Sequence, residues 1–68
     1  MVDWTGILSS KKSVKAVKKF ATGTTTGKEL YSEFSNTDNG GEVRTMLRTY
    51  GVTYGRRLAR KALKRRGY

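Results

Sequence analysis

The sequence predicts an all-α fold: one small basic domain over 1–68, made of three or four helices. Three observations support this class. Apolar residues recur at helical spacing in three stretches, polar runs rich in glycine separate those stretches, and no proline is present to interrupt a helix. A chain of 68 residues without cysteine has a small core and no disulfide to reinforce it. An extended chain that takes its order from an assembly is therefore the alternative.

The first predicted element is an amphipathic, lysine-rich helix over 9–22, which follows a short N-terminal segment over 1–8. At 100° per residue its cations fill one arc of the helix: Lys11, Lys12, Lys15, Lys18 and Lys19. The opposite arc is apolar: Val14, Ala16, Val17, Phe20 and Ala21. Ser9 or Ser10 is suited to cap its start, and Gly23 is placed to end it.

The second predicted element is a short helix over 27–35. Thr26 and Glu29 have the spacing of a capping box, in which each side chain accepts a hydrogen bond from the backbone amide of the other residue. Leu30 and Phe34 lie four residues apart, so they share one face of this helix. The sequence thus predicts both the start and the apolar face of the element.

The stretch from Gly23 to Lys28 is similar to a phosphate-binding P-loop but departs from it twice. Three residues rather than four separate the glycines, and Glu29 stands where Ser or Thr would hold magnesium. Nucleotide hydrolysis is therefore not expected. A weaker expectation is one phosphate contact at Gly27 and Lys28, because amides are free at the start of a helix. Plain capping of the helix is the other interpretation.

The third predicted element covers 42–66, as one helix or as two helices with a bend at 51–55. Its apolar residues form a continuous stripe: Val43, Met46, Leu47, Tyr50, Tyr54, Leu58, Ala62 and Leu63. Gly51 and Gly55 would each cost about 1 kcal/mol inside a helix, so we favour the bend. Asn39 is predicted to cap the start of this element.

The distribution of charge is the strongest functional signal. Fifteen Lys and Arg oppose five Asp and Glu, which gives a net charge of +10. Residues 9–26 and 43–68 contain no acid, and four of the five acids lie in 27–42. Solvent-exposed charged faces usually mix signs, so we expect an external polyanion to supply the counter-charge. The expected contacts to its phosphates are the five lysines above and Arg44, Arg48, Arg56, Arg57, Arg60, Lys61, Lys64, Arg65 and Arg66.

The aromatic residues divide into two groups. Phe20, Phe34 and Tyr50 fall on apolar faces and are expected in the core, whereas Trp4 and Tyr31 are expected to be freer. Tyr54 and Tyr68 lie within or beside the basic stripe of 56–66. These two are the candidates for stacking on bases, and Tyr68 is alternatively an anchor for a partner's pocket.

The residues needed for catalysis are scarce. The chain has no histidine and no cysteine, and its acids could form a site only by converging across a loop. We therefore expect no enzyme activity, no metal and no cofactor.

The pattern favours a non-enzymatic structural protein that neutralises the phosphate backbone of DNA or RNA. Small basic packaging proteins of phage and viral capsids, and small ribosomal proteins, are similar in composition. Between these settings we expect a virion, with other capsid proteins as partners and a location in the virion or the host cytoplasm.

Two alternatives remain open. In the first, a membrane-surface protein lays its apolar residues in an anionic interface beside the lysines: Trp4, Ile7, Leu8, Val14, Val17 and Phe20. In the second, 27–35 and 42–50 form a helix-turn-helix regulator. A membrane span and a secretory signal are not expected, because the apolar part over 4–8 is too short and precedes the lysines.

Overall fold

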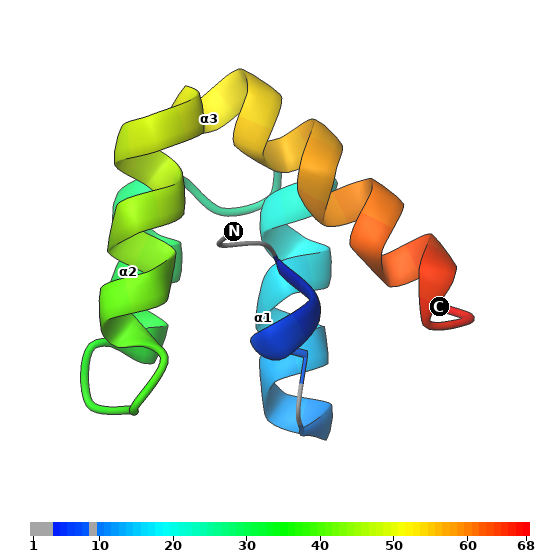
Figure 1. Cartoon of the computed structure of the whole chain (residues 1–68), viewed down its shortest axis with the longest axis horizontal. Coiled ribbons are helices and arrows are strands. Elements are labelled where there is room, and N and C mark those ends of the chain that lie inside the picture. The colour runs from blue at the N-terminus through cyan, green and yellow to red at the C-terminus, as the bar shows by residue number, and fades with distance from the viewer. Residues whose placement is uncertain (1–3, 9) are drawn as a thin grey trace.

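The computed structural model describes residues 4–8 and 10–68, and these residues form helices and no strand (Figure 1). A 3-10 turn, η1 (Trp4–Gly6), precedes three helices: α1 (Lys11–Ala21), α2 (Gly27–Phe34) and α3 (Gly40–Arg65). The Cα radius of gyration is 10.3 Å, and a compact domain of this length is expected near 11 Å. The predicted all-α class is confirmed, and the extended alternative is wrong.

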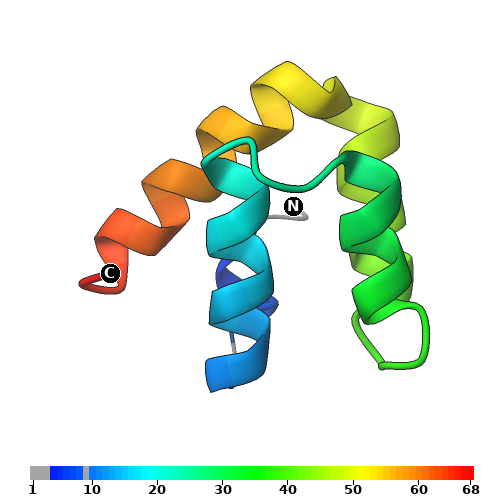
Figure 2. The same ribbon diagram turned by 180° about the vertical axis from the view of Figure 1, so that it is seen from behind.

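The helices form an arch around α1 (Figures 1 and 2). Helix α2 and the first half of α3 (40–50) lie side by side and run in opposite directions, joined by a loop at 35–39. The second half of α3 (52–65) then turns away from this hairpin and crosses the C-terminal end of α1. Helix α1 and η1 therefore occupy the space between the two arms of the arch.

The change of direction in α3 occurs at one residue. Gly51 has φ 76° and ψ 176°, whereas the residues on both sides are helical. This combination is accessible to glycine and almost to nothing else, because a Cβ would collide with the backbone. The predicted bend within 51–55 is therefore confirmed and lies at its first residue. Gly55 remains helical and buried, and an added Cβ there would lie 4.0 Å from Cε2 of Phe20.

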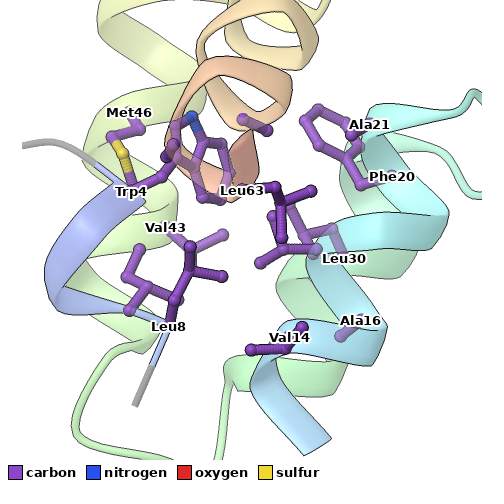
Figure 3. Packing of buried hydrophobic residues seen from close by; sticks show 14 of the residues in the cluster. Trp4, Leu8, Val14, Ala16, Phe20, Ala21, Leu30, Val43, Met46 and Leu63 are labelled. Carbon is purple, nitrogen blue, oxygen red and sulfur yellow. The ribbon is translucent and has the colours of Figure 1, made fainter. Parts of the chain in front are cut away.

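Buried apolar side chains from η1 and all three helices form one core (Figure 3). The predicted core positions Phe20 and Phe34 are buried, and Tyr50 packs against the core while half-buried. Trp4 was expected to be free, but only 1% of it is exposed and its ring lies 5.7 Å from that of Phe20. Tyr31 is also packed against the core rather than free.

The burial of Trp4 follows from the short turn that contains it. The amides of Ile7 and Leu8 both donate to the carbonyl oxygen of Trp4, at 3.1 and 3.3 Å. Because of this turn, the side chains of Trp4, Ile7 and Leu8 all enter the space between the arms of the arch. Helical periodicity cannot be read from so short an element, so sequence patterns did not reveal it.

The predicted caps of α1 and of the start of α2 are confirmed, although α1 (Lys11–Ala21) and α2 (Gly27–Phe34) are slightly shorter than the predicted 9–22 and 27–35. Ser10 Oγ accepts from the Ser13 amide at 3.2 Å, and Ser9 lies outside the described residues. After α1, Gly23 has φ +85°, and the amide of Thr24 donates to Lys19 O at 2.8 Å, as in a Schellman motif.

At α2 both hydrogen bonds of the capping box between Thr26 and Glu29 are present, at 3.0 and 3.1 Å. The start of α3 differs from the prediction. The helix begins at Gly40 rather than at 42, and Asn39 occupies the N-cap position without a side-chain capping bond. Its backbone, at φ −91° and ψ −1°, lies in the α region, whereas a capping side chain requires an extended backbone.

We predict opposite effects for alanine at two glycines of α3. Gly51→Ala should destabilise the fold by about 1–3 kcal/mol, because alanine disfavours the kinked backbone. Gly41→Ala is the matched control: it lies in the same helix, nothing is within 4 Å of an added Cβ, and alanine should stabilise it by about 0.5–1 kcal/mol. Thermal unfolding should separate the two variants by at least roughly 5 °C. Equal melting temperatures would contradict a kink that needs glycine.

Candidate nucleic-acid interface

The lysine face of α1 is exposed, as predicted. All five lysines of this helix are exposed, and the five residues of the opposite arc are buried. In α3 the exposed predicted cations are Arg44, Arg48, Arg57, Arg60, Lys61, Lys64 and Arg65, with Arg66 exposed just after its end. Only Arg56 among the predicted contacts is half-buried.

The acids lie on a different part of the molecule. Glu29, Glu33, Asp38 and Glu42 are exposed on α2, the 35–39 loop and the start of α3. These segments form the hairpin arm of the arch, away from the C-terminal end of α3 (Figure 1). The lysine face approaches them at its N-terminal end, where Lys12 and Glu33 line one hollow of about 120 Å³. By contrast, no acidic residue lines the surface that Lys18 of α1 shares with Arg60 and Lys64 of α3.

Two arginines on the second half of α3 donate hydrogen bonds to backbone carbonyl groups of the same chain. The Nε and Nη2 atoms of Arg56 donate to the carbonyl oxygens of Phe20 and Thr25 at 3.1 and 2.9 Å, and its guanidinium lies 5.1 Å from the Phe20 ring centroid. Arg60 Nη1 donates to Ala21 O at 2.9 Å. Carbonyl groups at the end of a helix lack intrahelical donors and carry partial negative charge. Arg56 and Arg60 therefore stabilise the end of α1.

The sequence predicted Arg56 and Arg60 only as contacts to phosphate, whereas the structure shows both in contact with carbonyl groups of the chain itself. Residues 56 and 60 share the side of α3 that faces α1, together with the buried Ala59 and Leu63. Arg57, Lys61 and Arg65 lie on another side of the same helix and are exposed. A run of cations in a helix does not reveal which member meets a neighbouring carbonyl.

The capping interpretation of this helix start is confirmed, and the structure adds no support for a phosphate contact at Gly27. Gly27 is buried, and an added Cβ would lie 3.3 Å from Val52 Cγ2. Glu29 Oε1 accepts from the Thr26 amide, so the start of α2 already holds a carboxylate. A phosphate arriving there would meet that negative charge. Lys28 is exposed beside it.

Both predicted stacking residues are exposed, in different surroundings. Tyr54 is 50% exposed, and its ring meets the Tyr50 ring edge-on at 5.6 Å. Tyr68 is 60% exposed and lies at an open groove that was not predicted. Seven residues from α1, the turn after it and the end of α3 line this groove: Lys18, Ala21, Thr22, Arg60, Leu63, Lys64 and Tyr68.

The sequence could not reveal this groove, because its two walls are about forty residues apart in the chain. A local signal did exist for one wall. Gly67 follows the last helical turn, where glycine commonly lets the next residue fold back. The Tyr68 amide indeed donates to Leu63 O at 2.9 Å.

Other kinds of site find no support in the part of the chain that the structure describes. Over 4–8 and 10–68, no three acidic side chains gather closely enough to hold a metal ion. Over the same residues, no helix has the length and apolar character needed to cross a membrane. The chain matches no protein-family model, no curated protein and no solved structure. Its function is therefore argued from its own residues.

We predict that adjacent arginines of α3 differ in their effect on stability. Arg56→Gln should destabilise the fold by about 1–3 kcal/mol, because it removes charged hydrogen bonds to carbonyls of Phe20 and Thr25. Arg57→Gln removes the same charge from an exposed position and should change stability by less than about 0.5 kcal/mol. Urea unfolding of both variants measures the difference. If both lose the same stability, Arg56 has no structural role.

Proposed function

We propose that this protein is a non-enzymatic structural protein that binds and neutralises nucleic-acid backbone, as a component of a nucleoprotein assembly such as a virion. The observation that carries the proposal is the spatial separation of charge. Two acid-free cationic segments, far apart in sequence, meet where the second half of α3 crosses the end of α1. The described acids lie on the hairpin arm instead.

The spacing of the exposed cations supports contact with a backbone. Arg57, Lys61 and Arg65 follow one another at intervals of four residues. At a rise of about 1.5 Å per residue, these three positions span about 12 Å along the helix. One strand of a duplex places a phosphate every ~3.4 Å along its axis, so the three cations would face a run of three or four phosphates.

The membrane-surface alternative requires an exposed apolar surface at the N-terminal segment and α1, and the structure buries the side chains that would form it. Trp4, Ile7 and Leu8 are at most 3% exposed, and Val17 and Phe20 are fully buried. Their apolar area is used in the core, so it is not available to a lipid interface. A cationic contact with lipid headgroups would have to rely on charge alone.

The helix-turn-helix alternative is not supported either. Helix α2 and the first half of α3 run side by side in opposite directions (Figure 2), which is an αα-hairpin. Helices in a helix-turn-helix motif cross at about 90–120°. The two helices on which this alternative depended therefore lack the crossed arrangement of that motif.

The salt dependence of binding tests the proposed function. With about six cations engaged, log affinity for duplex DNA should fall with log salt at a slope near −5. Affinity should then drop over a thousandfold between about 50 and 200 mM salt. Fluorescence anisotropy of a labelled duplex measures this, with anionic vesicles as the comparison. A slope shallower than about −2, together with salt-resistant vesicle binding, would refute the proposal.

The two basic segments should differ in importance. Replacing Arg57, Lys61 and Arg65 with glutamine should flatten the salt slope by about 2–3, because their side of α3 carries no nearby acid. Replacing Lys11, Lys12 and Lys15 removes the same charge from the end of α1 that approaches Glu33, and should flatten the slope by less than about 1. An equal or larger effect of the lysine variant would show that the interface lies on the first half of α1.

A further inference from the structure

The groove beside Tyr68 combines an apolar floor with a cationic rim. Ala21 and Leu63, both buried, form part of its lining, and the groove has a volume of about 380 Å³. Lys18, Arg60 and Lys64 line it as well, and no acidic residue does. Small-molecule sites are commonly about 300–1,000 Å³. The groove is thus large enough for one small group, and its cationic rim favours a ligand with negative charge beside that group.

The ring of Tyr68 is held in place but remains largely open. The amides of Gly67 and Tyr68 donate to the carbonyl oxygens of Lys64 and Leu63, so the chain folds back over the last turn of α3. The Nζ atom of Lys18 lies 5.3 Å from the ring centroid. Because 60% of the residue is exposed, much of the ring is accessible to a ligand.

We propose that this groove holds one unpaired base of single-stranded nucleic acid, stacked on Tyr68, with the flanking phosphates contacted by Lys18 and Lys64. This inference rests on the proposed function and adds the form of nucleic acid to it. An aromatic face provides stacking, and cations beside it bind the backbone. A base inside a duplex is already stacked on both sides, so it cannot use the ring. When the strand binds, the Lys18 ammonium leaves the Tyr68 ring and contacts a phosphate instead.

Tyr54 lacks this combination. Its exposure is similar, at 50%, and it lies in the same half of α3. It does not line the groove, and its ring is engaged with Tyr50. Tyr54 is therefore the matched control for Tyr68.

The first test compares two single strands of equal length and equal phosphate number. One is oligothymidine, and the other carries abasic sugars throughout. The wild-type protein should bind the base-bearing strand at least about fivefold more tightly, which is the lower range for stacking on one aromatic side chain. Tyr68→Ala and Tyr68→Leu should abolish that preference. Tyr68→Phe and Tyr54→Ala should retain it, and melting curves should show that all four variants remain folded.

The second test removes two charges in different places. Lys18→Gln with Lys64→Gln takes both lysines from the groove, and Lys19→Gln with Lys61→Gln takes neighbouring exposed lysines from the same two helices. Backbone neutralisation alone predicts that the first pair loses no more affinity for oligothymidine than the second, because Lys61 belongs to the proposed backbone contacts. The groove predicts a loss at least about threefold larger for the first pair, since these lysines also position the stacked nucleotide.

The outcomes separate the inference from the proposed function. Tight binding of both strands without preference, unchanged by Tyr68→Ala, would overturn the base-stacking groove and leave backbone binding intact. Failure to bind any nucleic acid at low salt, or binding of anionic vesicles alone, would overturn both. A preference that persists in Tyr68→Ala but disappears in Tyr54→Ala would place the stacking site at Tyr54 instead.

Discussion

Arg56 of α3 lies over the Phe20 ring and donates hydrogen bonds to the carbonyl oxygens of Phe20 and Thr25. Arg60 adds a bond to Ala21 O one turn later. Together they hold the second half of α3 against the end of α1 and the loop after it, where backbone carbonyl groups carry partial negative charge. The arch, the groove and the cationic surface all depend on this contact. It is possible only because Gly51 turns the helix back over α1.

The same contact concentrates positive charge in a small volume. It brings Lys18 of α1 beside Arg60 and Lys64 of α3, and no acidic residue lines the groove between them. Like charges at this proximity oppose folding, although water and salt screen much of the repulsion. The burial of apolar side chains such as Phe20, Ala59 and Leu63 offsets part of that cost. A bound polyanion would offset the rest, so folding and binding favour each other.

The N-terminal segment has a structural role that also bears on function. Trp4 and Leu8 lie in the core between α1 and α3 (Figure 3), and Ile7 belongs to the same buried cluster. Once they are buried, the exposed surface of α1 is its lysine face. A chain whose apolar residues are used in its own core presents mainly charge to a partner. Under the proposed function, electrostatic contact would be its main means of recognition, with Tyr68 as an additional aromatic surface.

The amino-acid sequence by itself determined the all-α class, the amphipathic faces, the capping box at Thr26 and the bend near Gly51. Each of these is a local property, decided by spacing or by the conformational range of one residue. Only the tertiary structure decided that Trp4 is buried, that Arg56 donates a hydrogen bond to a carbonyl group at the end of α1, and that the Lys18 ammonium lies over the Tyr68 ring. These depend on contacts between segments far apart in the chain. Net charge and periodicity are the same for a cation that faces solvent and for one that meets a distant carbonyl group, so neither property could distinguish them.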